Sequence, residues 1–148
     1  MIIKKILFIL TLVFVVFGSA NATGPQPATM PIIEGANPTT SLTYEDLRAI
    51  FTLVVSRWAD GSRIVVVILS SDNELQRQFL FEYFGLTPAR YNEIVESRVS
   101  SGRAKPPVIV NTESEMIRKV SGTVGSVGFT SRDIYIGAKD GVKVVPIF

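Results

Sequence analysis

Residues 64–69 are six consecutive aliphatic residues, and this run limits the fold of the 148-residue chain more than any other feature. Most of the six are β-branched, which favours a strand. A strand without polar alternation is covered on both faces, as in the parallel sheets of α/β proteins. The sequence therefore predicts an interior strand with helices packed on each side of its sheet.

Helix start signals recur on both sides of this strand. Three residue pairs have the spacing of a capping box, and one Thr-Pro step combines an N-cap with a first-turn proline. Apolar residues at helical spacing follow each start, so one face of each helix should pack on the core. The pairs are Thr43 with Asp46, Ser71 with Glu74 and Thr112 with Glu115, and the step is Thr87-Pro88.

Shorter apolar segments supply the other strands. Residues 30–34 are a candidate for a short first strand and residues 108–110 for a short buried strand. Residues 124–129 form a strand candidate among glycines, and residues 142–147 form the last one. Strands that alternate with capped helices predict an α/β fold: a three-layer sandwich with a mostly parallel sheet and an antiparallel edge.

The first 22 residues have the pattern of a cleavable secretory signal peptide. Lys4 and Lys5 form its positive region, residues 6–17 its apolar region, and residues 20–22 a small-x-small cleavage site. The apolar run is shorter than the ~20 residues of a membrane span. We therefore expect cleavage after Ala22, export to the periplasm, and no membrane anchor after cleavage.

The remaining chain divides into two parts. Residues 23–40 are rich in Pro, Thr, Ala and Gly and are expected to form an amino-terminal tether that contains the short first strand. Residues 41–148 are expected to form a single α/β lobe. About 126 residues after processing are enough to bury a core without covalent crosslinks.

Composition excludes several function classes. The chain has no Cys and no His, which excludes disulfides, His/Cys zinc sites and Ser-His-Asp catalysis. The signal carries two of the 15 basic residues and none of the 13 acidic ones, so the processed chain has 13 of each and is formally neutral. A neutral chain gives no electrostatic reason to expect nucleic acid as a partner. We therefore expect no catalytic residues, no metal and no cofactor.

From residue 42 onward the sequence resembles one lobe of the type II periplasmic solute-binding fold, in particular the phosphate-binding-protein group. The resemblance implies a non-enzymatic substrate-binding component of an ABC transporter, with inorganic phosphate or another small oxyanion as ligand. Two lobes close on the ligand in that group, whereas this chain has the length of one, so capture would need a homodimer or a partner protein. The order and spacing of four segments carry the resemblance: 42–51 (LTYEDLRAIF), 57–62 (RWADGS), 64–69 leading into the helix with Phe79, and 116–129.

The loop after residues 64–69 is where the resemblance places the oxyanion. The phosphate-binding group has an Arg and a Ser-Gly-Thr run there, whereas this loop reads SSDNEL at residues 70–75. Ser70, Ser71 and Asn73, with the free N–H groups of the next helix, are the candidate anion ligands. Asp72 and Glu74 place two carboxylates in the same turn, where they repel phosphate. A plain capped helix start is therefore the alternative.

A basic loop at residues 100–107 is the second candidate anion site. It contains Arg103 and Lys105 and follows Arg98. Such a cluster binds an anion or an acidic partner surface, or it is only solvated. Arg103 is therefore included among the candidate anion ligands.

Three aromatic residues are candidates for an interface: Trp58, Phe81 and Phe84. Trp58, the sole Trp, either anchors a partner or packs on the domain with its N–H satisfied. Aromatic residues on more than one face of the helix at residues 75–84 indicate burial on two sides or contact with another subunit. The alternative function is therefore an envelope interaction or assembly module that has lost anion binding.

Overall fold

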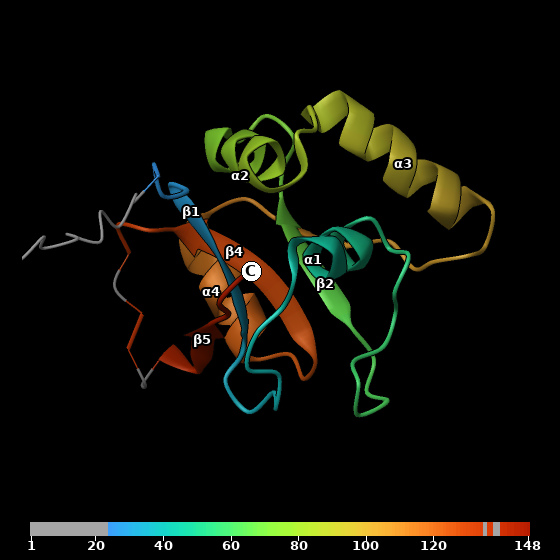
Figure 1. The fold of residues 1–148 in the computed structure, drawn as a ribbon. Helices are drawn as coiled ribbons and strands as arrows, with labels where there is room; N and C mark the ends of the chain where they lie inside the picture. Colours follow the sequence, from blue (N-terminus) through green and yellow to red (C-terminus); the bar gives the residue numbers. More distant parts are fainter. Residues whose placement is uncertain (1–23, 135, 138–139) are drawn as a thin grey trace, which may run out of the picture.

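The computed structural model describes residues 24–134, 136–137 and 140–148, and the predicted signal peptide lies outside them (Figure 1). The described residues form one five-stranded sheet of order β3-β2-β4-β1-β5. Its strands are β1 (Thr29–Glu34), β2 (Val65–Leu69), β3 (Val108–Val110), β4 (Ser126–Ser131) and β5 (Val142–Val144). The helices are α1 (Tyr44–Phe51), α2 (Glu74–Phe84), α3 (Pro88–Ser100) and α4 (Glu113–Ser121).

The sheet is mostly parallel, as the sequence predicts. β2 pairs in parallel with β3 and with β4, whereas β1 pairs in antiparallel fashion with β4 and with β5. Only β1 therefore runs against the other described strands. It is the short first strand predicted at residues 30–34, and it lies inside the sheet between β4 and β5 rather than at an edge.

Side chains of β4 point alternately to two helical layers. The ring of Phe129 stacks on Phe79 of α2 with centroids 4.1 Å apart and lies 6.3 Å from Phe51 of α1. On the other face, a Cβ atom added to Gly128 would lie 2.5 Å from the Sδ of Met116 in α4. The sheet is the middle layer, with α1 and α2 on one face and α4 on the other (Figure 1). The predicted three-layer sandwich is confirmed.

β3 differs from its prediction as a buried strand. It is the last strand on its side of the sheet and pairs only with β2. Ile109 at its centre is 63% exposed. A three-residue apolar run does not distinguish an interior strand from an edge strand, because burial depends on which neighbours pair with it.

The start of α1 contains the predicted capping box. Thr43 Oγ1 accepts a hydrogen bond from the Asp46 N–H at 3.0 Å, and the Asp46 carboxylate accepts from the Thr43 N–H at 3.2 Å. α3 and α4 also begin at their predicted caps, Thr87 and Thr112. Local side-chain chemistry therefore explains why the sequence predicts these three helix starts correctly.

We expect Thr43→Ala to lower the free energy of unfolding by about 1 kcal/mol, because the Asp46 N–H loses its acceptor. Urea denaturation followed by circular dichroism measures the change. Thr40→Ala is the matched control, since this exposed threonine precedes the helix and caps nothing. Equal stability of the Thr43 and Thr40 variants would contradict the cap assignment.

Candidate functional site

The candidate anion ligands on the loop after β2 lie at the carboxyl edge of the sheet, defined here by the carboxyl ends of β2, β3 and β4. Open α/β sheets bind ligands at this kind of edge. The Ser70 N–H donates to the Val110 carbonyl at 3.2 Å, which extends the pairing of β2 with β3. The Asn73 N–H then donates to the Ser70 carbonyl at 3.0 Å, and Ser71 is exposed between them. Ser70, Ser71 and Asn73 therefore share one turn.

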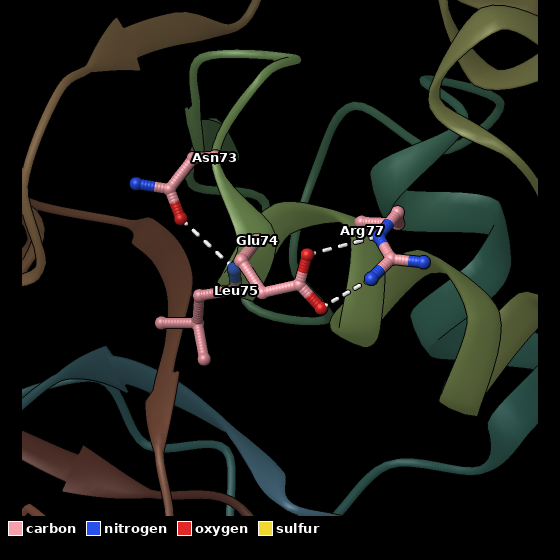
Figure 2. A network of polar contacts seen from close by, with 4 residues as sticks. All are labelled: Asn73, Glu74, Leu75 and Arg77. Carbon is pink, nitrogen blue, oxygen red and sulfur yellow. Dashed lines mark hydrogen bonds and ion pairs between the residues drawn. The ribbon is translucent and has the colours of Figure 1, made fainter.

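Asn73, rather than Ser71, caps α2. Its Oδ1 accepts a hydrogen bond from the Leu75 N–H at 2.9 Å (Figure 2). The capping box predicted for Ser71 and Glu74 is wrong, because the turn after Ser70 delays the helix by two residues. One of the first N–H groups of α2, that of Leu75, thus already has a protein acceptor and is not available to an oxyanion.

The Glu74 side chain points toward the following helical turn of α2 and not back toward the N-cap. Its carboxylate accepts two hydrogen bonds from the Arg77 guanidinium, with the Nε donor at 3.0 Å (Figure 2). The side-chain hydrogen bond with Glu74 raises the pKa of Arg77. Both side chains of this pair are exposed. Arg77, the basic residue nearest to the turn in sequence, is therefore engaged with a carboxylate.

Other carboxylates hold backbone amides along the carboxyl edge. The Glu115 carboxylate accepts from the Asn111 N–H at 2.8 Å, and Glu113 accepts from the amide at the end of β4. Glu82 of α2 accepts from the Thr29 N–H at 3.1 Å and from its hydroxyl at 2.6 Å. An incoming oxyanion would compete with these carboxylates for the same donors and would be repelled by their charge. These carboxylates thus hold several donors along the carboxyl edge and place negative charge there.

Arg103 lies at the opposite edge of the sheet. It belongs to the loop before β3, and β3 runs parallel to β2, so this loop is at the amino end of both strands. Arg103 lines a pocket with Val66, whereas Ser70 is four residues farther along, about 13 Å away in an extended chain. The structure does not bring Arg103 together with Ser70, Ser71 and Asn73.

The pocket lined by Arg103 has a volume of about 480 Å³ and is called the basic pocket below. Arg63 and Lys105 line it as well. The sequence pattern indicated the two basic residues of the loop but not Arg63. Parallel strands begin at the same edge of a sheet. The position of Arg63 just before β2 could therefore have indicated that it lies near the basic loop before β3.

The three candidate interface residues have different surroundings. Trp58 is only 6% exposed, and its Nε1–H donates to the Gly125 carbonyl at 2.8 Å. Phe84 is also buried and packs 5.9 Å from the ring of Phe51. Interface roles for Trp58 and Phe84 therefore disagree with their burial. Phe81 is 73% exposed, so its ring is accessible to solvent.

The carboxylate of Asp60 stabilises the turn that follows Trp58. Asp60 accepts hydrogen bonds from the Ser62 hydroxyl at 2.6 Å and from the Ser62 N–H at 2.9 Å. The hydroxyl bond is the largest cause of the lowered pKa of Asp60.

Within the described ranges, no three acidic residues gather into a group that could hold a metal ion. The described helices also include none that is long and apolar enough to cross a membrane.

Two tyrosine hydroxyls connect helices to backbone carbonyls. Tyr83 of α2 donates to the Thr29 carbonyl at 2.9 Å, and Tyr91 of α3 donates to the Phe51 carbonyl at 2.8 Å. Burial raises the pKa of Tyr83 to about 12 and also raises the pKa of Tyr91. Both phenols are therefore structural donors in their protonated form.

We expect the free energy of unfolding to fall as the pH rises above about 10, where tyrosine in an unfolded chain loses its proton. Tyr83 keeps its proton up to about pH 12 in the folded state. The unfolded state then binds fewer protons than the folded state and is favoured, whereas below pH ~10 the contribution is fully present. Urea denaturation from pH 9 to 11 tests this, with Tyr83→Phe/Tyr91→Phe expected to decline less. An equal decline in both proteins would contradict it.

Solved structures of phosphate-binding proteins have the same fold. An ABC-type phosphate transport receptor from Vibrio cholerae is 22% identical, with a TM-score of 0.53 over 81% of this chain and 46% of that chain. PstS from Borrelia burgdorferi is 17% identical, with a TM-score of 0.56 over 81% and 47%. A Clostridium perfringens structure with bound phosphate is 20% identical, with a TM-score of 0.54 over 81% and 44%.

At these identities the likeness establishes the fold, which is that of periplasmic binding proteins (PBP-like). The chain spans less than half the length of these solved structures. No protein-family model and no curated protein matches the sequence.

Proposed function

We propose that this chain is a non-enzymatic binding protein of the periplasm, and that the carboxyl edge of its PBP-like lobe docks on another envelope protein. The absence of His and Cys from the sequence supports a role without catalysis, since common hydrolytic mechanisms depend on these residues. The observation that carries the docking function is the row of carboxylates along the carboxyl edge, contributed by Glu82, Glu113 and Glu115. These carboxylates accept hydrogen bonds from the amides of Thr29, Asn111 and Ser131, so an oxyanion would meet negative charge there.

The exposed groups near this edge define the kind of partner. Asp72 is exposed in the turn before α2, and Phe81 is exposed on α2 itself. A carboxylate and a phenyl ring on one helical unit suit a protein surface that offers a basic side chain and an apolar contact. Aromatic side chains are also common anchors of protein interfaces. We therefore assign Asp72 and Phe81 to the docking surface.

We expect immobilised protein to retain one stoichiometric partner from an envelope extract, and Asp72→Lys/Phe81→Ala to release it. Glu96→Lys is the matched control, because Glu96 is an exposed acidic residue of α3 outside the carboxyl edge. Mass spectrometry of the retained proteins gives the readout. Retention of the same proteins by the double variant, or of none by the unmodified protein, would contradict the assignment.

Oxyanion binding by the loop after β2 is the second candidate function. The bound phosphate in the Clostridium perfringens structure favours it, as does the position of Ser70 and Ser71 before a helix N-terminus. A ligand at a hundred times its dissociation constant adds about 2.7 kcal/mol to the free energy of unfolding. A phosphate-specific rise in melting temperature that Ser70→Ala/Ser71→Ala abolishes would therefore replace docking with anion binding. We expect no such rise at fixed ionic strength.

A further inference from the structure

We propose that the basic pocket at the amino edge of the sheet binds a small amphipathic anion, with an oxyanion headgroup and a short apolar body. The proposal goes beyond the docking function and does not depend on it, since this pocket and the carboxyl edge lie at opposite ends of β2.

Three segments that are distant in sequence build the basic pocket. They are Leu53, Val55 and Ser56 after α1, residues 63–66 at the start of β2, and residues 102–108, which lead into β3. The volume of about 480 Å³ is within the range of small-molecule sites. A pocket of this size is large for a single inorganic ion and suits a ligand with several carbon atoms.

Hydrogen bonds from α3 hold the walls of the basic pocket in place. The Arg98 Nε–H donates to the Leu53 carbonyl at 3.0 Å, which fixes the segment after α1. The Arg98 carbonyl accepts from the Arg103 N–H at 3.0 Å and from the Ala104 N–H at 3.2 Å, which fixes the start of the loop. The walls are therefore preformed, and binding would cost little ordering of the chain.

All the charged residues that line the basic pocket are positive. Arg63, Arg103 and Lys105 line it and are exposed, and no acidic residue is among its lining residues. The ion pairs of the described part of the chain join Glu74 with Arg77 and Arg90 with Glu93, so they do not involve these three cations.

Arg63, Arg103 and Lys105 line the same pocket, and like charges repel one another unless an anion lies between them. The two guanidinium groups are also suited to bidentate hydrogen bonds with a phosphate or a carboxylate. The charge and the donor groups of the basic pocket therefore favour an oxyanion headgroup.

The floor of the basic pocket is apolar. Leu53, Ile64 and Val66 line it and are buried to at least nine-tenths, and Val108 closes the side next to β3. A free phosphate ion could bind the cations at the rim but would leave this floor in contact with water. An apolar body attached to the headgroup would cover the floor and add affinity for each buried methylene group.

Isothermal titration calorimetry with hexyl phosphate, inorganic phosphate and hexanol on the purified protein tests the proposal. We expect hexyl phosphate to bind at least tenfold more tightly than either of the other two. Arg63→Ala/Arg103→Ala should weaken hexyl phosphate binding at least tenfold. Arg118→Ala/Lys119→Ala removes the same charge from exposed positions of α4 and should leave the binding unchanged.

Three results would overturn the proposal. Equal affinity for hexyl phosphate and inorganic phosphate would show that the apolar floor does not contribute to binding. Equal affinity for hexyl phosphate and hexanol would show that the cations do not contribute. Loss of binding in the α4 control as well would show a nonspecific charge effect. The docking test uses Asp72 and Phe81, so its failure would leave this result unaffected.

Discussion

Gly125→Ala should lower the free energy of unfolding by about 3–5 kcal/mol, through left-handed strain and overpacking together. Gly125 has a φ of +74°, and a Cβ atom there would lie 2.2 Å from the Arg63 carbonyl oxygen. The Gly125 carbonyl also accepts from the Trp58 Nε1–H at 2.8 Å and from the Val65 N–H at 3.1 Å. The backbone cannot move away from the clash without losing both hydrogen bonds.

Gly61→Ala separates the two parts of this effect. Gly61 has a φ of +86°, but a Cβ atom there would meet nothing within 4 Å. Its cost should therefore be the conformational term alone, about 1 kcal/mol. Urea denaturation followed by circular dichroism measures both variants. If Gly125→Ala were no less stable than Gly61→Ala, the close approach of Gly125 to the Arg63 carbonyl would be wrong.

Phe79→Ala should cost about 3–5 kcal/mol of unfolding free energy, because it opens a cavity at the centre of the aromatic core. Phe79 is fully buried, and its ring lies 4.1 Å from Phe129, 4.9 Å from Phe51 and 5.4 Å from Phe84. Phe81→Ala is the matched control two residues along α2. Because Phe81 is 73% exposed, its truncation should change stability by no more than about 0.5 kcal/mol. Similar denaturation midpoints for the two variants would contradict this core.

The features that the sequence predicts correctly depend on neighbouring residues. Thr43, Thr87 and Thr112 each cap the predicted helix, because a cap needs only a side-chain oxygen and an amide two or three residues later. The aliphatic run at residues 64–69 forms an interior strand because burial on both faces requires that composition. The PBP-like order of elements follows from these local signals.

The features that the sequence does not predict depend on pairing between distant residues. Ser71 fails as a cap because Ser70 continues the pairing of β2 with β3, which a one-dimensional pattern does not contain. Phe81 and Phe84 are both aromatic residues of α2, and only the position of the sheet decides that Phe84 is the buried one. The separation of Arg103 from the loop after β2 is likewise a property of strand direction.

The position of β1 between β4 and β5 has a consequence for the order in which the chain can fold. Hydrogen bonds join Pro27 to Arg132 and Asn37 to Lys143, across 105 and 106 residues of sequence. Contacts of such separation carry a high loop-closure entropy and form late. A chain emerging amino end first, from a ribosome or a translocation channel, therefore cannot complete its sheet until β4 and β5 have emerged. During that interval β1 is an unpaired strand, exposed to proteases and to chaperones that bind extended segments.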